Sequence, residues 1–216
     1  DTLKFYEILL GMHRAGILQD LQQQDDRPLV WEIGAGWGGF AYQFKKQVPD
    51  ATYLILDFPE LFLFSAVYLK NLFPSAKMRM FGDVAAKRTF EDWQEFDFIF
   101  APHTFLQDMA PERVDLTINM VSFQEMTSEQ VRSYCEKAAA LGCPRMYSLN
   151  RERSKYNEQL SSVSKIIGEC YRTRRIPMLE LSYNEMEMPA PQVAESTPRE
   201  PFYQHILGTL APEQAP

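Results

Sequence analysis

Cysteine is scarce in this chain. The three cysteines, Cys135, Cys143 and Cys170, are odd in number and lack CxxC spacing. Both a disulfide framework and a zinc site need cysteines in matched sets, so the sequence argues against either. Free thiols are typical of a reducing compartment, and we therefore expect a cytoplasmic protein.

Long apolar runs and an excess of positive charge are missing too. The longest apolar stretch, residues 61–69, is interrupted by Ser65 and reaches less than half of the ~20 residues that a membrane span requires. The 22 lysines and arginines face 29 aspartates and glutamates, a net charge of -7, unlike the basic footprint of a nucleic-acid binder. We expect neither a membrane nor a nucleic acid as partner.

Apolar residues are present in sufficient number for one well-packed core, since they make up 45% of 216 residues. Strand patterns alternate with helix patterns, which favours a mainly parallel sheet covered on both faces by helices. No helix pattern separates the last two strands, so we expect them to pair antiparallel at one edge. Strands are expected at residues 29–33, 52–57, 77–81, 96–101, 114–119, 145–149, 174–183 and 202–210. Helices are expected at residues 3–21, 40–48, 59–72, 127–141 and 157–168.

A glycine-rich turn joins the first expected strand to a helix. Such a turn lets the backbone approach a ligand, and the following helix offers free N–H groups. The glycines fit two templates: Gly34, Gly36 and Gly39 match the dinucleotide pattern GxGxxG, whereas Gly34, Gly36 and Gly38 match the E/D-x-G-x-G-x-G of methyltransferases. A tight turn without a ligand remains an alternative.

One of two acidic residues near the turn favours a methyl donor over a nicotinamide. Asp57 ends the second strand, where a carboxylate accepts hydrogen bonds from ribose hydroxyls in both cofactor classes. Glu32 has no task in the nicotinamide fingerprint, but in methyltransferases an acid here helps to hold the turn and the ammonium group of S-adenosylmethionine. The antiparallel terminal strand pair supports the same choice.

From about residue 29 to residue 210, the chain resembles the sugar O-methyltransferases, a branch of the class I S-adenosylmethionine-dependent methyltransferases, and the resemblance rests on five motifs. The first two motifs are shared by many methyltransferases. The SFQEM run at residues 122–126 is more specific to the sugar O-methyltransferases. The motifs are WEIGAGWGG (31–39), LILDFPE (54–60), DFIFAP (97–102), VDLTINMVSFQEM (114–126) and YSLN (147–150). The resemblance implies a Rossmann-like α/β fold with a seven-stranded, mainly parallel sheet, an antiparallel last strand and an extra N-terminal helix.

The resemblance also implies which residues hold S-adenosylmethionine. Gly34, Gly36 and Gly38 would line its methionine portion, and Asp57 its ribose. Phe58 would pack on the adenine, with core packing as the alternative. For the adenine edge there are two candidates, Asp83 and the backbone around residues 103–105, of which we favour the second. The cofactor set is completed by Glu32, Pro102, His103 and Asn119.

Transfer to a sugar hydroxyl calls for a general base, because such a hydroxyl is a poor nucleophile. Glu125 follows the fourth main strand, where the chain leaves the sheet beside the reactive end of the cofactor, and it is our first choice. Its alternative role is a structural carboxylate that caps the helix near Thr127 or binds a backbone N–H. His103 and His205 are the next candidates. Mg²⁺ could activate a sugar diol, but no acidic cluster with ligand spacing is visible, so no metal is expected.

The segment 151–175 carries local positive charge. Seven basic residues against three acidic ones leave +4, which suits either a phosphate on the acceptor or a solvated helix face. The basic residues are Arg151, Arg153, Lys155, Lys165, Arg172, Arg174 and Arg175. We expect a sugar or glycoside acceptor, and the sequence leaves a homo-oligomer open. The expected parts are an N-terminal helix and linker (1–27), a methyltransferase domain (28–210) and a tail (211–216).

Overall fold

Five buried parallel strands form the centre of the fold. The computed structural model describes residues 2–82, 86–152, 157–177 and 203–211. The strands read as near-continuous apolar runs, as expected where helices cover both faces of a sheet. They are β1 (Leu29–Ile33), β2 (Thr52–Asp57), β4 (Phe98–Pro102), β5 (Leu116–Met120) and β6 (Arg145–Asn150).

Three further strands complete the sheet, whose order among the described residues is β3-β4-β2-β1-β5-β6-β8-β7. β3 (Met78–Met80) runs parallel to β4, whereas β8 (Gln204–Thr209) runs antiparallel to both β6 and β7 (Arg172–Arg175). The predicted class and the antiparallel last strand are confirmed. The sheet has eight strands rather than seven, because both segments between residues 73 and 114 that read as strands pair with a neighbour.

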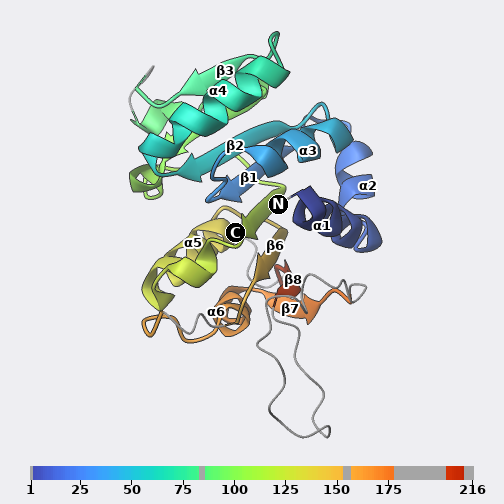
Figure 1. Cartoon of the computed structure of the whole chain (residues 1–216), viewed down its shortest axis with the longest axis vertical. Helices are drawn as coiled ribbons and strands as arrows, with labels where there is room; N and C mark the ends of the chain where they lie inside the picture. Colours follow the sequence, from blue (N-terminus) through green and yellow to red (C-terminus); the bar gives the residue numbers. More distant parts are fainter. Residues whose placement is uncertain (1, 83–85, 153–156, 178–202, 212–216) are drawn as a thin grey trace, which may run out of the picture.

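Helices cover the two faces of the sheet (Figure 1). One core cluster joins the sheet to the N-terminal helices, α3 and α4, and the other joins it to α5 and α6. The helices are α1 (Thr2–Arg14), α2 (Ile17–Gln22), α3 (Gly39–Gln47), α4 (Phe62–Leu72), α5 (Ser128–Ala140) and α6 (Val163–Cys170). Short 3-10 turns are η1 (Pro59–Leu61), η2 (Ala86–Phe90), η3 (Trp93–Glu95), η4 (His103–Phe105) and η5 (Phe123–Glu125).

Two expected helices differ from the structure. The helix expected at 3–21 is split into α1 and α2 at Gly16, whose φ of 78° is left-handed. The helix expected at 157–168 begins only at Val163, because the Ser162 hydroxyl accepts the N–H of Lys165 and caps the helix there. The capping box at the start of α5 is as predicted: Thr127 accepts the N–H of Gln130, and Gln130 accepts the N–H of Thr127.

Several predictions lie outside the described residues. These are the adenine-edge candidate Asp83, the basic residues Arg153 and Lys155, most of the strand expected at 174–183 and nearly all of the tail. The division at residue 27 stays a prediction, although Phe5 and Met12 of α1 share a core cluster with Phe40 of α3. Within the described ranges, no helix has the length and apolar character needed to cross a bilayer.

Candidate cofactor-binding and active site

The glycine turn leaves β1 in a left-handed conformation at three positions. Gly34, Gly36 and Gly38 have φ values of 73°, 57° and 82°, which residues other than glycine rarely adopt. A Cβ on Gly34 would lie 2.4 Å from Ser122 Oγ, and one on Gly38 would lie 3.1 Å from Ser65 Cβ. At Gly36 a Cβ would meet nothing within 4 Å. Protein atoms therefore occupy the space at two of these glycines, and Gly36 is the one that faces open space.

Asp57 ties this turn to the end of β2. Its Oδ2 accepts the N–H of Gly36 at 2.8 Å, and its Oδ1 accepts the N–H of Phe58 at 2.8 Å. The carboxyl group is 7% exposed, and burial raises its pKa against the opposing effect of these backbone bonds. Each carboxylate oxygen has a second lone pair, so Asp57 can accept bonds from ligand hydroxyls while it holds the turn.

Glu32 lies in the buried interior beside the turn. Tyr53 donates its hydroxyl to Glu32 Oε2 at 2.9 Å, while the other carboxyl oxygen, Oε1, is buried and has no hydrogen-bond partner among the described residues. Burial raises the pKa of Glu32 to about 8, and the nearby Asp57 adds to that rise. A buried carboxyl oxygen without a partner lowers the stability of the fold. The Glu32 carboxyl therefore suits a role in which a bound ligand supplies a cationic or N–H partner.

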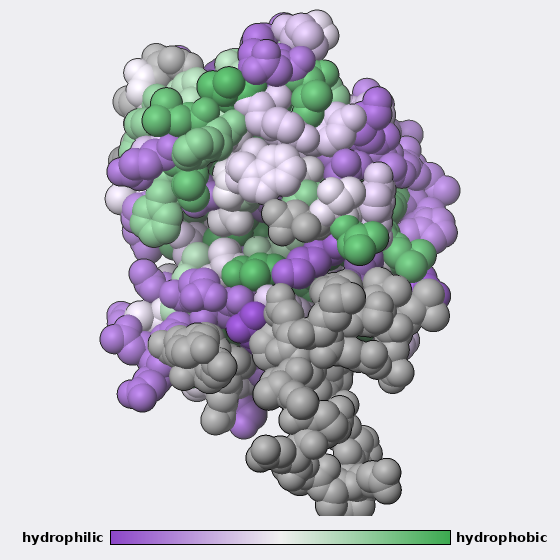
Figure 2. Space-filling model, viewed as in Figure 1, coloured by the Kyte–Doolittle hydropathy of each residue, from purple (hydrophilic) through white to green (hydrophobic). Residues whose placement is uncertain are grey.

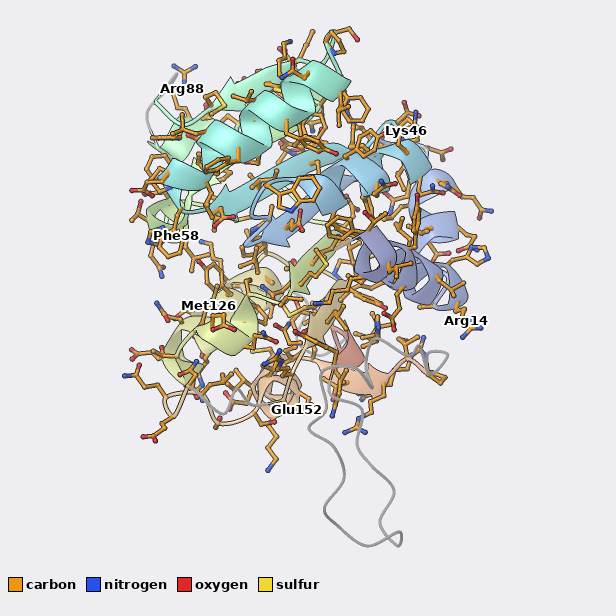
Figure 3. The ribbon with its side chains drawn as sticks, viewed as in Figure 1. Arg14, Lys46, Phe58, Arg88, Met126 and Glu152 are labelled. Carbon is orange, nitrogen blue, oxygen red and sulfur yellow. The ribbon has the colours of Figure 1, made fainter. Side chains whose placement is uncertain are left out.

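Phe58 and His103 form an aromatic pair at the carboxyl ends of β2 and β4. Phe58 is 58% exposed, and its ring lies 4.7 Å from that of His103 in an edge-to-face arrangement. Pro102 pairs with Asp57 across these strands, which brings η4 beside the ribose candidate. His103 Nδ1 is buried and has no hydrogen-bond partner in the part of the chain that the structure describes. Figure 3 shows Phe58 at the outer rim of this edge of the sheet. An exposed aromatic ring in this place could pack on a planar ligand.

Asn119, predicted to contact the cofactor, is fully engaged by the protein. Its amide group donates to Ile33 O at 2.9 Å and to Ser122 Oγ, and its Oδ1 accepts from Phe123 N at 3.1 Å and from Asn150 Nδ2 at 2.8 Å. These four bonds use both donors and both lone pairs of the side chain. Asn119 therefore positions β1, β5 and β6 relative to one another and has no bond left for a ligand.

Glu125 is exposed in η5, just beyond the end of β5. Its Oε1 accepts from Gln124 Nε2 at 3.1 Å, and the buried Gln124 also accepts the N–H of Arg151 at 3.1 Å. Asn157 fixes the same turn by donating to the carbonyls of Gln124 and Met126. The cap of α5 is Thr127 instead of Glu125, so the helix-capping alternative is wrong.

His205 has two buried partners beneath α1. Its Nδ1 lies 2.8 Å from Tyr147 Oη, and its Nε2 lies 3.2 Å from Glu7 Oε1. This arrangement agrees with the alternative interpretation of His205 as a core histidine. No interaction among the described residues brings Glu125, His103 and His205 together, so the three candidate bases occupy separate places.

The basic residues of segment 151–175 do not converge on one site within the described part of the chain. Arg151 donates to Tyr203 Oη at 3.1 Å, and Lys4 of α1 lies 4.6 Å from the centre of the same ring. Arg172, Arg174 and Arg175 are instead exposed along the edge strand β7. The described residues also contain no group of three or more His, Cys, Asp or Glu side chains that could hold a metal ion.

Sequence reasoning missed the side chains that fix the end of β5. Ser122, Gln124 and Asn150 link this turn to β1 and β6 through hydrogen bonds. The polar residues in NMVSFQEM and in YSLN were the available signal, since polar side chains at the ends of buried strands need partners.

Comparisons with known proteins identify the fold. No family model and no curated protein matches the chain. Among solved structures, WbdD in a co-crystal with the kinase inhibitor LY294002 has a TM-score of 0.59 at 13% identity, over 96% of this chain and 40% of that one. The CurJ carbon methyltransferase has a TM-score of 0.57 at 13% identity, over 95% of this chain and 54% of that one.

A third neighbour was solved with a cofactor. Human N-acetylserotonin methyltransferase in complex with SAM has a TM-score of 0.50 at 13% identity, over 91% of this chain and 51% of that one. The chain thus spans about half the length of these neighbours or less. Together with the strand order and the antiparallel β8, the similarity shows that the chain has the Rossmann-like fold of the class I SAM-dependent methyltransferases.

Proposed function

We propose that this protein is an S-adenosylmethionine-dependent O-methyltransferase that methylates a hydroxyl of a sugar or glycosylated small molecule. The observation that carries the proposal is the arrangement at the carboxyl ends of β1 and β2: Gly36 faces open space and its N–H is held by Asp57. In open α/β sheets, ligands bind at this edge, where the strand order reverses.

The residues at this edge fit S-adenosylmethionine, which supplies an electrophilic methyl group when bound. Asp57 would accept bonds from the ribose hydroxyls, and the exposed ring of Phe58 would pack on the adenine. The unpartnered oxygen of Glu32 suits the ammonium end of the methionine portion, directly or through the turn. The SAM complex of one fold neighbour supports the same cofactor class.

The choice of a hydroxyl acceptor rests on Glu125 and on the resemblance of the SFQEM run to sugar O-methyltransferases. Glu125 is the exposed carboxylate at the end of β5, held by a buried glutamine and free of a helix-capping task. A general base there would take the proton of the attacking hydroxyl, while most of the rate would come from holding that oxygen in line with the methyl group.

Two measurements test the proposal in sequence. Calorimetry with S-adenosylhomocysteine and with NAD should give binding of the first alone, and binding of NAD alone would replace the proposal by an oxidoreductase. A mass-spectrometric screen of sugars, glycosides and non-sugar alcohols with S-adenosylmethionine should then give a mass increase on a glycoside. Methylation of non-sugar alcohols alone would replace the sugar or glycoside by a non-sugar hydroxyl as the acceptor. Cofactor binding without any methylated product would indicate a binding module.

A further inference from the structure

The outer face of α4 is apolar where a surface helix is ordinarily polar. Leu63, Phe64 and Val67 are 74%, 61% and 56% exposed, and they lie next to one another at i, i+1 and i+4. Figure 2 shows apolar side chains gathered over the part of the molecule where Figure 1 places α4. Single exposed apolar residues are common, but a contiguous group marks an interaction surface.

The corresponding helix on the opposite face of the sheet is different. Although α5 packs on its own core cluster much as α4 does, its exposed positions include Glu129, Gln130 and Glu136. The packing of the sheet therefore does not require an apolar outer face on a covering helix. The exposed residues of α4 call for a partner of their own.

Charged residues lie at the two ends of the apolar stripe. Glu60 in η1 and Lys70 near the end of α4 are both exposed, and they fall on the same helical stripe as Leu63 and Val67. Residue 65 is the midpoint between residues 60 and 70, and it is also the midpoint between residues 63 and 67. At a rise of about 1.5 Å per residue in α4 and about 2.0 Å in η1, Glu60 and Lys70 stand about 16 Å apart along the axis.

This symmetry points to one occupant. If two copies of α4 pack antiparallel about a twofold axis at the level of residue 65, Leu63 meets Val67 of the partner subunit. Glu60 then faces Lys70 of the partner subunit, and the same pair forms a second time. A twofold interface requires a patch that is complementary to itself, and this stripe meets the requirement in both its apolar and its charged residues.

We propose that the outer face of α4 is the interface of a symmetric homodimer in which the two α4 helices pack antiparallel. The proposal does not depend on the reaction catalysed, because Leu63, Phe64 and Val67 lie on the side of α4 opposite the residues that pack on the sheet. The dimer would cover the apolar stripe and leave the carboxyl edge of each sheet with its own Asp57 and Gly36.

Sedimentation velocity on the full chain tests this proposal over a range from low micromolar to several hundred micromolar. We expect a reversible monomer–dimer equilibrium. Leu63→Asp should raise the dimer dissociation constant at least about 30-fold, since it places two desolvated charges at the centre of the interface. Because Leu63 is mostly exposed, the variant should keep the melting temperature of the unaltered protein at concentrations where both proteins are monomeric.

A charge exchange tests the antiparallel register. Glu60→Lys or Lys70→Glu alone creates two like-charge pairs and should raise the dissociation constant roughly tenfold, whereas the double variant should restore it to within about threefold. Glu129→Lys on the outer face of α5 is the matched control and should change little. A monomer at every concentration, a dimer insensitive to Leu63→Asp, or a double variant as weak as the single ones would each overturn the proposal.

Discussion

The two halves of the carboxyl edge of the sheet use their polar side chains differently. In the half formed by β1, β2 and β4, polar atoms remain available: Glu32 has an unpartnered oxygen, Asp57 has spare lone pairs, and Gly36 faces open space. In the half formed by β5 and β6, Asn119 and Asn150 satisfy one another and the backbone.

The difference separates a binding task from a positioning task. Unsatisfied buried groups cost stability, so a fold tolerates them where a ligand completes them, and closed networks make a rigid support. We therefore interpret the first half as the cofactor site. The second half would hold the turn that carries Glu125.

Gly36→Val should cause the largest loss of cofactor binding in the half formed by β1, β2 and β4. A β-branched side chain would fill the open space beside the turn, and a positive φ strains it, so binding of S-adenosylhomocysteine should fall at least about 1000-fold by calorimetry. Gly16→Val is the matched control, because Gly16 also has a positive φ and open space but lies between α1 and α2. Equal binding losses in both variants would remove the turn from the cofactor site.

Glu125→Gln tests the second half through turnover. The amide keeps the size of the side chain but has no proton affinity, so kcat should fall by about 100-fold while cofactor binding and melting temperature persist. Single-turnover rates measured beside a Glu129→Gln control separate this effect from a change in surface charge. A variant at full rate would move the base to His103, whose Nδ1 lacks a partner, and then to His205.

Much of the first half could be predicted because its signals are local. A strand, a glycine turn, a helix and an acid at the end of the next strand all follow from short sequence patterns, and the capping box of α5 did as well. The register of parallel strands then brings Asp57 to the turn.

The second half depends on contacts between distant segments. Whether Asn119 faces a ligand or Asn150 is decided by the pairing of β5 with β6, and the partners of His205 come from both Tyr147 and the distant Glu7. No local pattern encodes such contacts. For the same reason, the sequence could not predict that the missing side chain of Gly34 makes room for Ser122.

Asp57→Ala should have a smaller effect than Gly36→Val on the same half. The loss of hydrogen bonds from a charged group to the ribose predicts weaker S-adenosylmethionine binding by about 1.5 to 3 kcal/mol. Some loss of stability should accompany it, because the N–H groups of Gly36 and Phe58 lose their acceptor. Affinity that stays unchanged in a folded variant would assign Asp57 to the turn alone.

Asn119→Ala should show the opposite pattern. Removing a buried side chain with four hydrogen bonds leaves the Phe123 N–H and one N–H of the Asn150 amide in need of new partners, and it should lower the free energy of unfolding by about 1 to 3 kcal/mol. Cofactor affinity, measured well below the melting temperature, should change less than tenfold. A larger loss of affinity with unchanged stability would return Asn119 to the set of ligand contacts.

Glu32→Gln gives the most specific effect, a change in the pH dependence of stability. Burial raises the pKa of Glu32 from 4.5 to about 8, so the protonated form is favoured in the folded state. Its contribution to stability is complete below the unfolded pKa and is lost as pH rises through the folded one. Relative to the variant, the free energy of unfolding should fall by about 1.4 kcal/mol per pH unit between these values and stay level outside them. Urea denaturation of both proteins from about pH 4 to 9 measures this difference. Parallel curves would mean that Glu32 ionises as readily in the folded protein as in the unfolded chain, and that the cofactor half keeps no buried neutral carboxyl group beside the turn.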